Sequence, residues 1–249
     1  MKRLDLLAGI DSKPALPTGM AREAVATLGR WIVNDRFATA VAMPTEPELA
    51  VALGFSRTTV RDAIKVLSGK GLVRTARRYG TRVTPVESWN LLDGDVIDWH
   101  EPEHPRMRRI FAESTELRAI MEPSAAELAA QRATDVQREA ILSAAHAMRP
   151  ESKDVQALFD ADCRFHVTIL EATQNQVMWQ LRQIILTMLR VSYEFGVMHP
   201  ENGPVTREGH IIVAEAIVHG DGPAARDAMA QMLRRNQSIA RDYWQERSS

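Results

Sequence analysis

The stretch GFSRTTVRDAI, residues 54–64, constrains the fold of this chain more than any other part of the sequence. Gly54 is suited to end one helix, and Ser56 is suited to cap the next, which we expect to run from Arg57 to Gly69. Apolar residues at helical spacing predict its buried stripe: Val60, Ala63, Ile64 and Leu67. Basic and hydroxyl side chains occupy the exposed side of its first turns: Arg57, Thr58, Thr59 and Arg61.

The residues before this helix predict a second helix and a DNA-binding motif. Thr45 and Glu48 form a capping-box pattern, Pro47 suits a first helical turn, and an amphipathic segment, 21–35, lies further upstream. Two helices joined by a short turn, the second with a basic N-terminus, are typical of a helix-turn-helix. Arginine can hydrogen-bond guanine edges, and free N–H groups at a helix N-terminus suit phosphate, so we expect DNA binding. A solvated helix end is the alternative interpretation.

Residues 71–85, GLVRTARRYGTRVTP, favour DNA binding. Their alternation predicts two short strands joined by a tight turn, with Arg78 and Gly80 at a basic tip. Residues 1–85 contain 14 Lys and Arg against 7 Asp and Glu, whereas the remaining residues contain 17 against 25. A basic first third joined to an acidic remainder is typical of a nucleic-acid-binding domain attached to a second domain.

The length of 249 residues is sufficient for two domains. No membrane-spanning run or export signal is recognisable, and a single cysteine excludes an internal disulfide framework, so we expect a cytoplasmic protein. We divide the chain into four parts: an N-terminal arm (1–20), a winged helix-turn-helix domain (21–85), a linker (86–104) and an all-helical effector-binding and dimerisation domain (105–249).

The linker contains two tryptophans, Trp89 and Trp99, which we expect to pack between the domains. It also contains His100 and His104, whose spacing of four occurs in metal sites on helices. Because Pro102 stands between them, we favour surface histidines.

The remainder of the chain is helical by periodicity, so the fold class is mostly α, with a C-terminal all-α bundle of six or seven helices. The predicted segments are 106–131, 135–148, 152–172, 176–198, 206–219 and 221–245.

Polar residues interrupt the apolar stripes of these helices. Asp162 and His166 lie one turn apart, His210 and Asn236 lie on later stripes, and Arg118 borders an earlier one. A buried carboxylate is costly unless it is paired or bound to a metal, and two imidazoles with a carboxylate suit Zn, Ni or Mn. A simple hydrogen-bonded pair in the core is the alternative.

The N-terminal part, roughly residues 20–85, resembles the winged helix of GntR-family transcription regulators. The resemblance rests on these residues and runs: Met43-Pro44-Thr45-Glu46, Glu48-Leu49-Ala50, Ser56 to Ile64, Leu67, Gly71-Leu72-Val73 and Gly80 to Val83. It implies that operator DNA is contacted by the following residues: Arg57, Thr58, Thr59, Arg61, Arg78 and Gly80.

The C-terminal part, roughly residues 105–245, resembles the helical effector domain, or FCD domain, of the FadR subgroup of that family. Metal-binding members have Asp-x3-His on one helix and two further histidines on later helices. Asp162, His166 and His210 match the first three positions, whereas Met232 stands at the fourth. The resemblance implies a divalent metal, with Zn favoured over Ni or Mn.

Met232 and the Trp-Asn-x-Leu-Asp-x-Asp-Val-x-x-Trp pattern at 89–99 also resemble sugar-acid-responsive members of the subgroup. This implies an aldonate effector, such as D-galactonate, whose carboxylate would pair with Arg118. Thr206, Asn236 and the histidines would hold its hydroxyl groups, with Met232 in the same site.

We therefore expect a homodimeric, DNA-binding transcriptional repressor of a sugar-acid catabolic operon, released from its operator by an aldonate and without enzymatic activity. Two alternatives remain open. One is a metal-dependent enzyme acting on sugar acids, although Glu171 and Glu215 fall off the inward stripes and no general base stands out. The other is a GntR regulator that responds to another small carboxylate.

Overall fold

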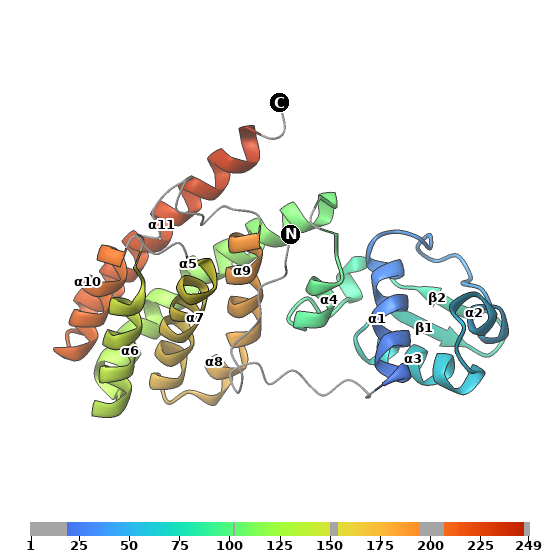
Figure 1. The fold of residues 1–249 in the computed structure, drawn as a ribbon, viewed down its shortest axis with the longest axis horizontal. Helices are drawn as coiled ribbons and strands as arrows, with labels where there is room; N and C mark the ends of the chain where they lie inside the picture. Colours follow the sequence, from blue (N-terminus) through green and yellow to red (C-terminus); the bar gives the residue numbers. More distant parts are fainter. Residues whose placement is uncertain (1–18, 102, 150–153, 195–206, 247–249) are drawn as a thin grey trace. The chain divides into compact units, whose positions relative to one another are not determined.

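The structure is a computed structural model that describes residues 19–101, 103–149, 154–194 and 207–246 (Figure 1). Side chains are described to residue 193 in the third range and to residue 235 in the fourth. These residues form two compact units, which divide after Met107. Among them, no helix is both long enough and apolar enough to cross a membrane.

The first unit contains a helix-turn-helix and a two-stranded wing (Figure 1). Its elements are α1 (Met20–Val33), α2 (Glu46–Leu53), α3 (Arg57–Gly69), β1 (Val73–Ala76) and β2 (Gly80–Val83). α1 and α2 both pack against α3, whose predicted apolar stripe is buried. The strands are antiparallel, with Val73 opposite Val83 and Ala76 opposite Gly80. The predicted winged helix is confirmed.

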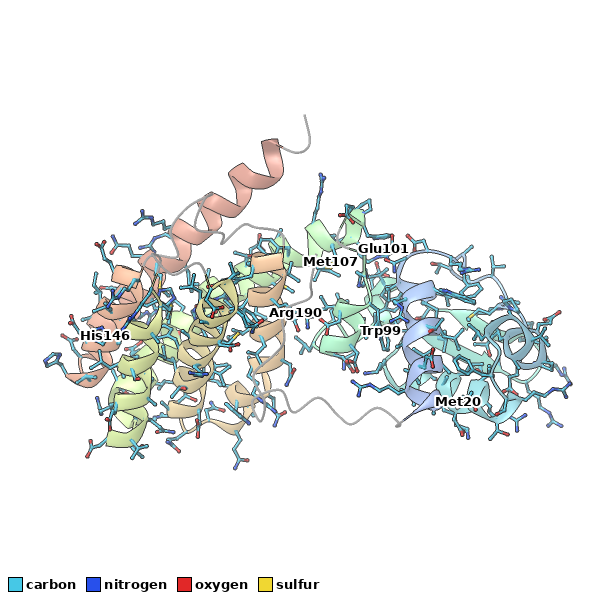
Figure 2. The ribbon with its side chains drawn as sticks, in the orientation of Figure 1. Met20, Trp99, Glu101, Met107, His146 and Arg190 are labelled. Carbon is cyan, nitrogen blue, oxygen red and sulfur yellow. The ribbon has the colours of Figure 1, made fainter. Side chains whose placement is uncertain are left out.

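The segment after the wing, which we predicted as a linker, packs onto this first unit. It forms a short 3-10 helix, η1 (Val86–Ser88), and α4 (Gly94–Asp98), and both of its tryptophans lie in the hydrophobic core of the unit. Trp99 lies against α1 (Figure 2), where a Cβ added to Gly29 would come within 2.2 Å of the indole. The two indoles therefore fix this segment to the first unit, in contrast to the expectation that they pack between domains.

Polar contacts fasten the same segment. The ammonium group of Lys70, the residue after α3, lies 2.6 Å from a carboxylate oxygen of Asp93 and 3.0 Å from one of Asp95. These side chains are at most 11% exposed, so solvent screens the ion pairs weakly. Asn34, after α1, donates to the backbone carbonyl of Trp99 at 3.0 Å. Residues at the ends of α3 and α1 therefore both bind the segment that follows the wing.

The two histidines of this segment differ from each other. His100 is buried, with Nδ1 2.9 Å from the carbonyl oxygen of Val96, so the expectation of a surface histidine is wrong at this position. Burial lowers the pKa of His100 to about 4. His104 is partly exposed, and its Nε2 lies 3.1 Å from a carboxylate oxygen of Asp35.

The second unit is helical throughout its described part. Its elements are α5 (Pro105–Arg132, whose first turn belongs to the first unit), α6 (Asp135–Ala147), α7 (Val155–Ala172), α8 (Gln176–Gln180), α9 (Arg182–Glu194), α10 (Arg207–Val218) and α11 (Gly222–Glu246). α6 packs against α7 and α10, α7 against α9, and α10 against α11 (Figure 1). The mostly helical fold class is confirmed, but the predicted segment 176–198 is divided at Leu181 into α8 and α9.

Replacement of Lys70 by Met should lower the free energy of unfolding by about 3 kcal/mol, because Asp93 and Asp95 would remain buried without their cation. Lys65→Met is the matched control, since Lys65 pairs with Asp62 at the surface and should contribute under about 1 kcal/mol. Urea unfolding monitored by tryptophan fluorescence measures both. Equal losses in the two variants would show that the Lys70 pairs do not hold the segment.

Candidate functional site

The turn between α2 and α3 positions the predicted DNA-binding residues. Gly54 ends α2 with a positive φ of 72°, a conformation that glycine adopts without strain. The hydroxyl of Ser56 then accepts a hydrogen bond from the N–H of Thr59 at 3.0 Å and starts α3. The first N–H groups of a helix lie at the positive end of its dipole, where a phosphate can bind.

The predicted recognition residues lie around this helix start. Arg57, Thr58 and Arg61 are exposed, and Thr59 is partly buried, with its hydroxyl 2.8 Å from that of Ser56. Arg61 donates from Nε to a carboxylate oxygen of Glu46 at 3.0 Å. The structure therefore brings the four predicted side chains to one surface, with Arg61 already oriented by α2.

The wing adds basic groups that the sequence interpretation did not single out. Arg78 and Gly80 lie exposed at the tip, as predicted. Arg74 and Arg82 stand directly opposite each other on β1 and β2, and both are exposed. Like charges at directly opposed positions destabilise a strand pair, and a phosphate between them would remove the repulsion. The sequence contains a signal for this pair: in a two-stranded wing, side chains alternate between the two faces, and the segment from Arg74 to Arg82 is rich in arginine.

In the second unit, α7 and α10 bring the three predicted metal ligands together. Nε2 of His166 lies 3.2 Å and Nε2 of His210 lies 3.3 Å from the same carboxylate oxygen of Asp162. One ligand atom from each residue falls within 4.8 Å of the others, and all three side chains are 1% exposed. Phe165 packs edge-on against both imidazoles, at 5.2 and 4.8 Å between ring centres, and so fixes their orientation.

The donor set fits a divalent ion. Ligand distances of about 2.0–2.2 Å around a tetrahedral Zn place neighbouring donor atoms roughly 3.3 Å apart, close to the two nitrogen–oxygen separations found here. Within the described part of the chain, neither carboxylate oxygen of Asp162 accepts a hydrogen bond of good geometry, although both are buried. A carboxylate left in this condition is costly, and an ion would satisfy it. These three residues thus form a possible metal site.

Glu122 completes this cluster and was missed by the sequence interpretation. It lies one turn after Arg118 on α5, and the two side chains form a buried ion pair. Its Oε2 lies 2.5 Å from Nδ1 of His166. This contact favours a proton on Nδ1 and leaves Nε2, which faces Asp162, available to a metal, an arrangement typical of carboxylate–histidine–metal sites.

The charges of the cluster shift its pKa values. Burial alone would lower the pKa of His166, but the carboxylates of Glu122 and Asp162 raise it to about 9. Burial would raise the pKa of Glu122, yet Arg118 and His166 lower it to about 2. The pKa of Asp162 is likewise held far below its usual range by the two histidines, against the effect of burial. At neutral pH the metal-free cluster therefore holds charged His166 and Arg118 against two carboxylates.

Beyond Arg118 and the two histidines, Met232 is the one predicted effector residue whose side chain the structure describes. Met232 is buried on α11 and lines a cavity of about 330 Å³ between α10 and α11. None of the three possible metal ligands lines that cavity, and its polar residues are Glu208, Gln231 and Arg235. Thr206 and the side chain of Asn236 lie outside the described residues. Glu171 and Glu215 are exposed, in agreement with their positions off the inward stripes.

Comparison with known proteins agrees with both units. Residues 20–83 match the family described as bacterial regulatory proteins, gntR family, and residues 113–235 match the FCD domain. The chain is 34% identical over 210 residues to the galactonate operon transcriptional repressor of Escherichia coli K12, a match that covers 84% of this chain and 91% of that protein. The chain belongs to the GntR family. It is a DNA-binding transcription regulator with an FCD effector domain, and its family does not consist of enzymes.

More distant GntR-family relatives are similar over most of the chain. The HTH-type transcriptional repressor NanR of Salmonella newport is 29% identical over 213 residues, covering 83% of this chain and 79% of that protein. The putative L-lactate dehydrogenase operon regulatory protein of Escherichia coli K12 is 28% identical, covering 88% and 85%. A solved structure of Lar, which controls expression of the Listeria monocytogenes agr system, has a TM-score of 0.63 at 18% identity, covering 91% of this chain and 98% of that one. This last likeness shows the fold alone.

Arg57→Ala and Arg74→Ala should weaken DNA binding in different ways. A base contact from Arg57 contributes to sequence discrimination, so its loss should cost about 1–3 kcal/mol against operator and much less against random DNA. A phosphate contact from Arg74 contributes equally to binding of operator and of random DNA. Its loss should weaken both, and should reduce the slope of log K against log salt concentration by about 0.9.

Fluorescence anisotropy of labelled DNA at several salt concentrations separates the two effects. Arg164→Ala, an exposed arginine on α7, is the control and should change neither affinity. Loss of operator preference in Arg74→Ala, or its retention in Arg57→Ala, would contradict the assignment.

Glu122→Gln should reduce zinc affinity about 10–100-fold, because it removes the carboxylate that orients His166. In the wild-type protein, zinc must displace the proton that His166 carries below pH about 9. Zinc binding at pH 7 should therefore release about one proton, and apparent affinity should rise about tenfold per pH unit below pH 9. In Glu122→Gln this proton release should shrink.

Titration calorimetry in two buffers of different ionisation enthalpy measures both quantities. Glu127→Gln is the matched control on the same helix, since Glu127 pairs with Arg226 near the surface. Unchanged zinc affinity in Glu122→Gln would remove Glu122 from the site.

Proposed function

We propose that this GntR-family regulator is a homodimeric repressor of an operon for sugar-acid catabolism, and that an aldonate acting with a bound divalent metal releases it from its operator. The buried cluster of Arg118, Glu122, Asp162, His166 and His210 is the observation that carries the proposal. The exposed basic surface of α3 and the wing supplies the DNA-binding half.

The metal would be held by Asp162, His166 and His210. Zinc is favoured because a nitrogen-rich set with one carboxylate and a tetrahedral spacing suits it. Three protein ligands leave one coordination position for another molecule, as in zinc sites that bind substrate rather than in closed structural sites. Met232 stands where the family resemblance implies a further histidine, and its thioether is a poor ligand for such an ion.

Charge balance supports a monocarboxylate as that other molecule. Without metal, Arg118 and protonated His166 neutralise Glu122 and Asp162. With a divalent ion in place of the His166 proton, the cluster carries one unit of excess positive charge. A buried unpaired charge is costly, so an anionic ligand with a single carboxylate is favoured. We expect Arg118, which lies one turn from Glu122 and beside His166, to pair with this carboxylate.

The similarity to the galactonate operon repressor supports a sugar acid as this carboxylate. The galactonate operon repressor and NanR are both named as repressors, and the first shares 34% of its aligned residues with this chain. D-Galactonate, a six-carbon monocarboxylate, is therefore the first effector to test. Two copies of the winged unit, each with its recognition helix in a major groove, would read a palindromic operator whose half-sites lie about one helical turn apart.

Release of the operator by effector tests this function. After operator selection from genomic DNA, fluorescence anisotropy of the zinc-loaded protein on that operator should fall when D-galactonate or another aldonate is added. Arg118→Ala should bind the operator as the wild type does but should no longer be released. Arg118→Lys retains the charge but not the bidentate geometry, and should respond only weakly.

Sedimentation velocity of the same samples should show a dimer on a single operator. An aldonate panel that never releases wild-type protein would refute the effector class, and release of Arg118→Ala at wild-type concentrations would remove Arg118 from the site. Operator binding by a monomer would refute the homodimer.

A further inference from the structure

Helix α9 buries polar side chains that lack partners. Gln183, Thr187 and Tyr193 are at most 9% exposed. Across the described part of the chain, neither the amide of Gln183 nor the hydroxyl of Thr187 makes a hydrogen bond. Positions 183, 187 and 190 recur every three or four residues and share one side of the helix, with Tyr193 at its edge; Arg190 from this side appears in Figure 2. We call Gln183, Thr187, Arg190 and Tyr193 the α9 polar face.

Local packing does not explain these groups. Other side chains of α9, such as Ile185 and Leu189, are apolar and equally buried. Elsewhere on the same helix a buried hydroxyl is satisfied, because Ser192 donates to the carbonyl oxygen of Met188 at 2.8 Å. Buried polar atoms almost always have partners, and unsatisfied ones are candidates for ligand contacts.

The α9 polar face lies beside the helix that carries Asp162 and His166, since α7 and α9 pack against each other. The ring of Tyr193 packs edge-on against Phe159 of α7, at 5.4 Å between centres, one turn before Asp162. Burial raises the pKa of Tyr193, and the Asp162 carboxylate raises it further. From Tyr193 the face extends along the axis by about 9 Å to Thr187 and about 15 Å to Gln183.

We propose that the α9 polar face binds the hydroxyl groups of the effector chain, while the effector carboxylate lies at the cluster of Arg118 and the metal ligands. This inference rests on the proposed function and deepens it. A polyhydroxylated acid of six carbons presents hydroxyls over a length similar to that from Tyr193 to Thr187. The hydroxyl of Thr187 and the amide of Gln183 both donate and accept, so they match hydroxyl groups and would select an aldonate over a short, mostly apolar acid.

The test uses Thr187→Val and Gln183→Met, which keep side-chain volume and remove hydrogen bonding. Calorimetry of the zinc-loaded, full-length protein measures the affinity for D-galactonate and for D-gluconate, which differ in the configuration of one hydroxyl. Each variant should bind D-galactonate about tenfold or more weakly and should discriminate less between the two acids. Zinc content should be unchanged, and the ligand-free variants should melt at the wild-type temperature or above it, because an unsatisfied polar group has been removed.

Ser192→Ala is the control, since its hydroxyl is satisfied within the helix on the opposite side, and it should bind D-galactonate as the wild type does. If the wild type and both variants bind D-galactonate equally, the α9 polar face is not in the site, and the proposed function stands. If neither aldonate binds the wild type, the aldonate proposal fails, and this inference fails with it. A lower melting temperature of the ligand-free variants would also overturn it, because it would show that the native groups are already satisfied.

Discussion

The buried carboxylate of Asp162 is the constraint on which the helical unit depends. A carboxylate that is 1% exposed must be neutralised by groups that the fold brings to it. The partners come from α7 itself and from α10, as His166 and His210, and His166 is in turn held by Glu122 of α5. Buried polar contacts therefore join three helices, and removal of Arg118 or His166 would leave a buried carboxylate without its cation.

The sequence predicted the core of this site because its members break a pattern. Asp162, His166 and His210 stand on apolar stripes, where polar residues need an explanation. Glu122 was missed because an arginine followed four residues later by a glutamate is usually a surface ion pair, and its spacing is the same when buried. Only the contact with His166, 44 positions away in the chain, shows that the pair lies in the interior.

The polar residues of α9 were missed for a different reason. Residues 182–193 are all buried, so every side of the described helix is covered and periodicity carries little information about which residues face a site. The winged unit shows the opposite case, since its caps, turn glycine and amphipathic stripe are local signals, and the structure follows them closely. Local signals did not show that the segment after residue 85 packs onto the winged unit. Its partners there, Gly29 and Lys70, are distant from it in sequence.

In the proposed metal site, three protein ligands rather than four would let the effector take part in holding the ion. A complete set of protein ligands would hold the ion whether or not effector is present, and the effector would then have no differential interaction with it. In the proposed site, metal binding creates an excess positive charge in a buried position, and the effector carboxylate removes it. The two ligands therefore stabilise each other, and by linkage each raises the affinity of the other. Since a coupling of about 1–3 kcal/mol changes affinity 5–150-fold, effector binding in the proposed site should depend measurably on the metal.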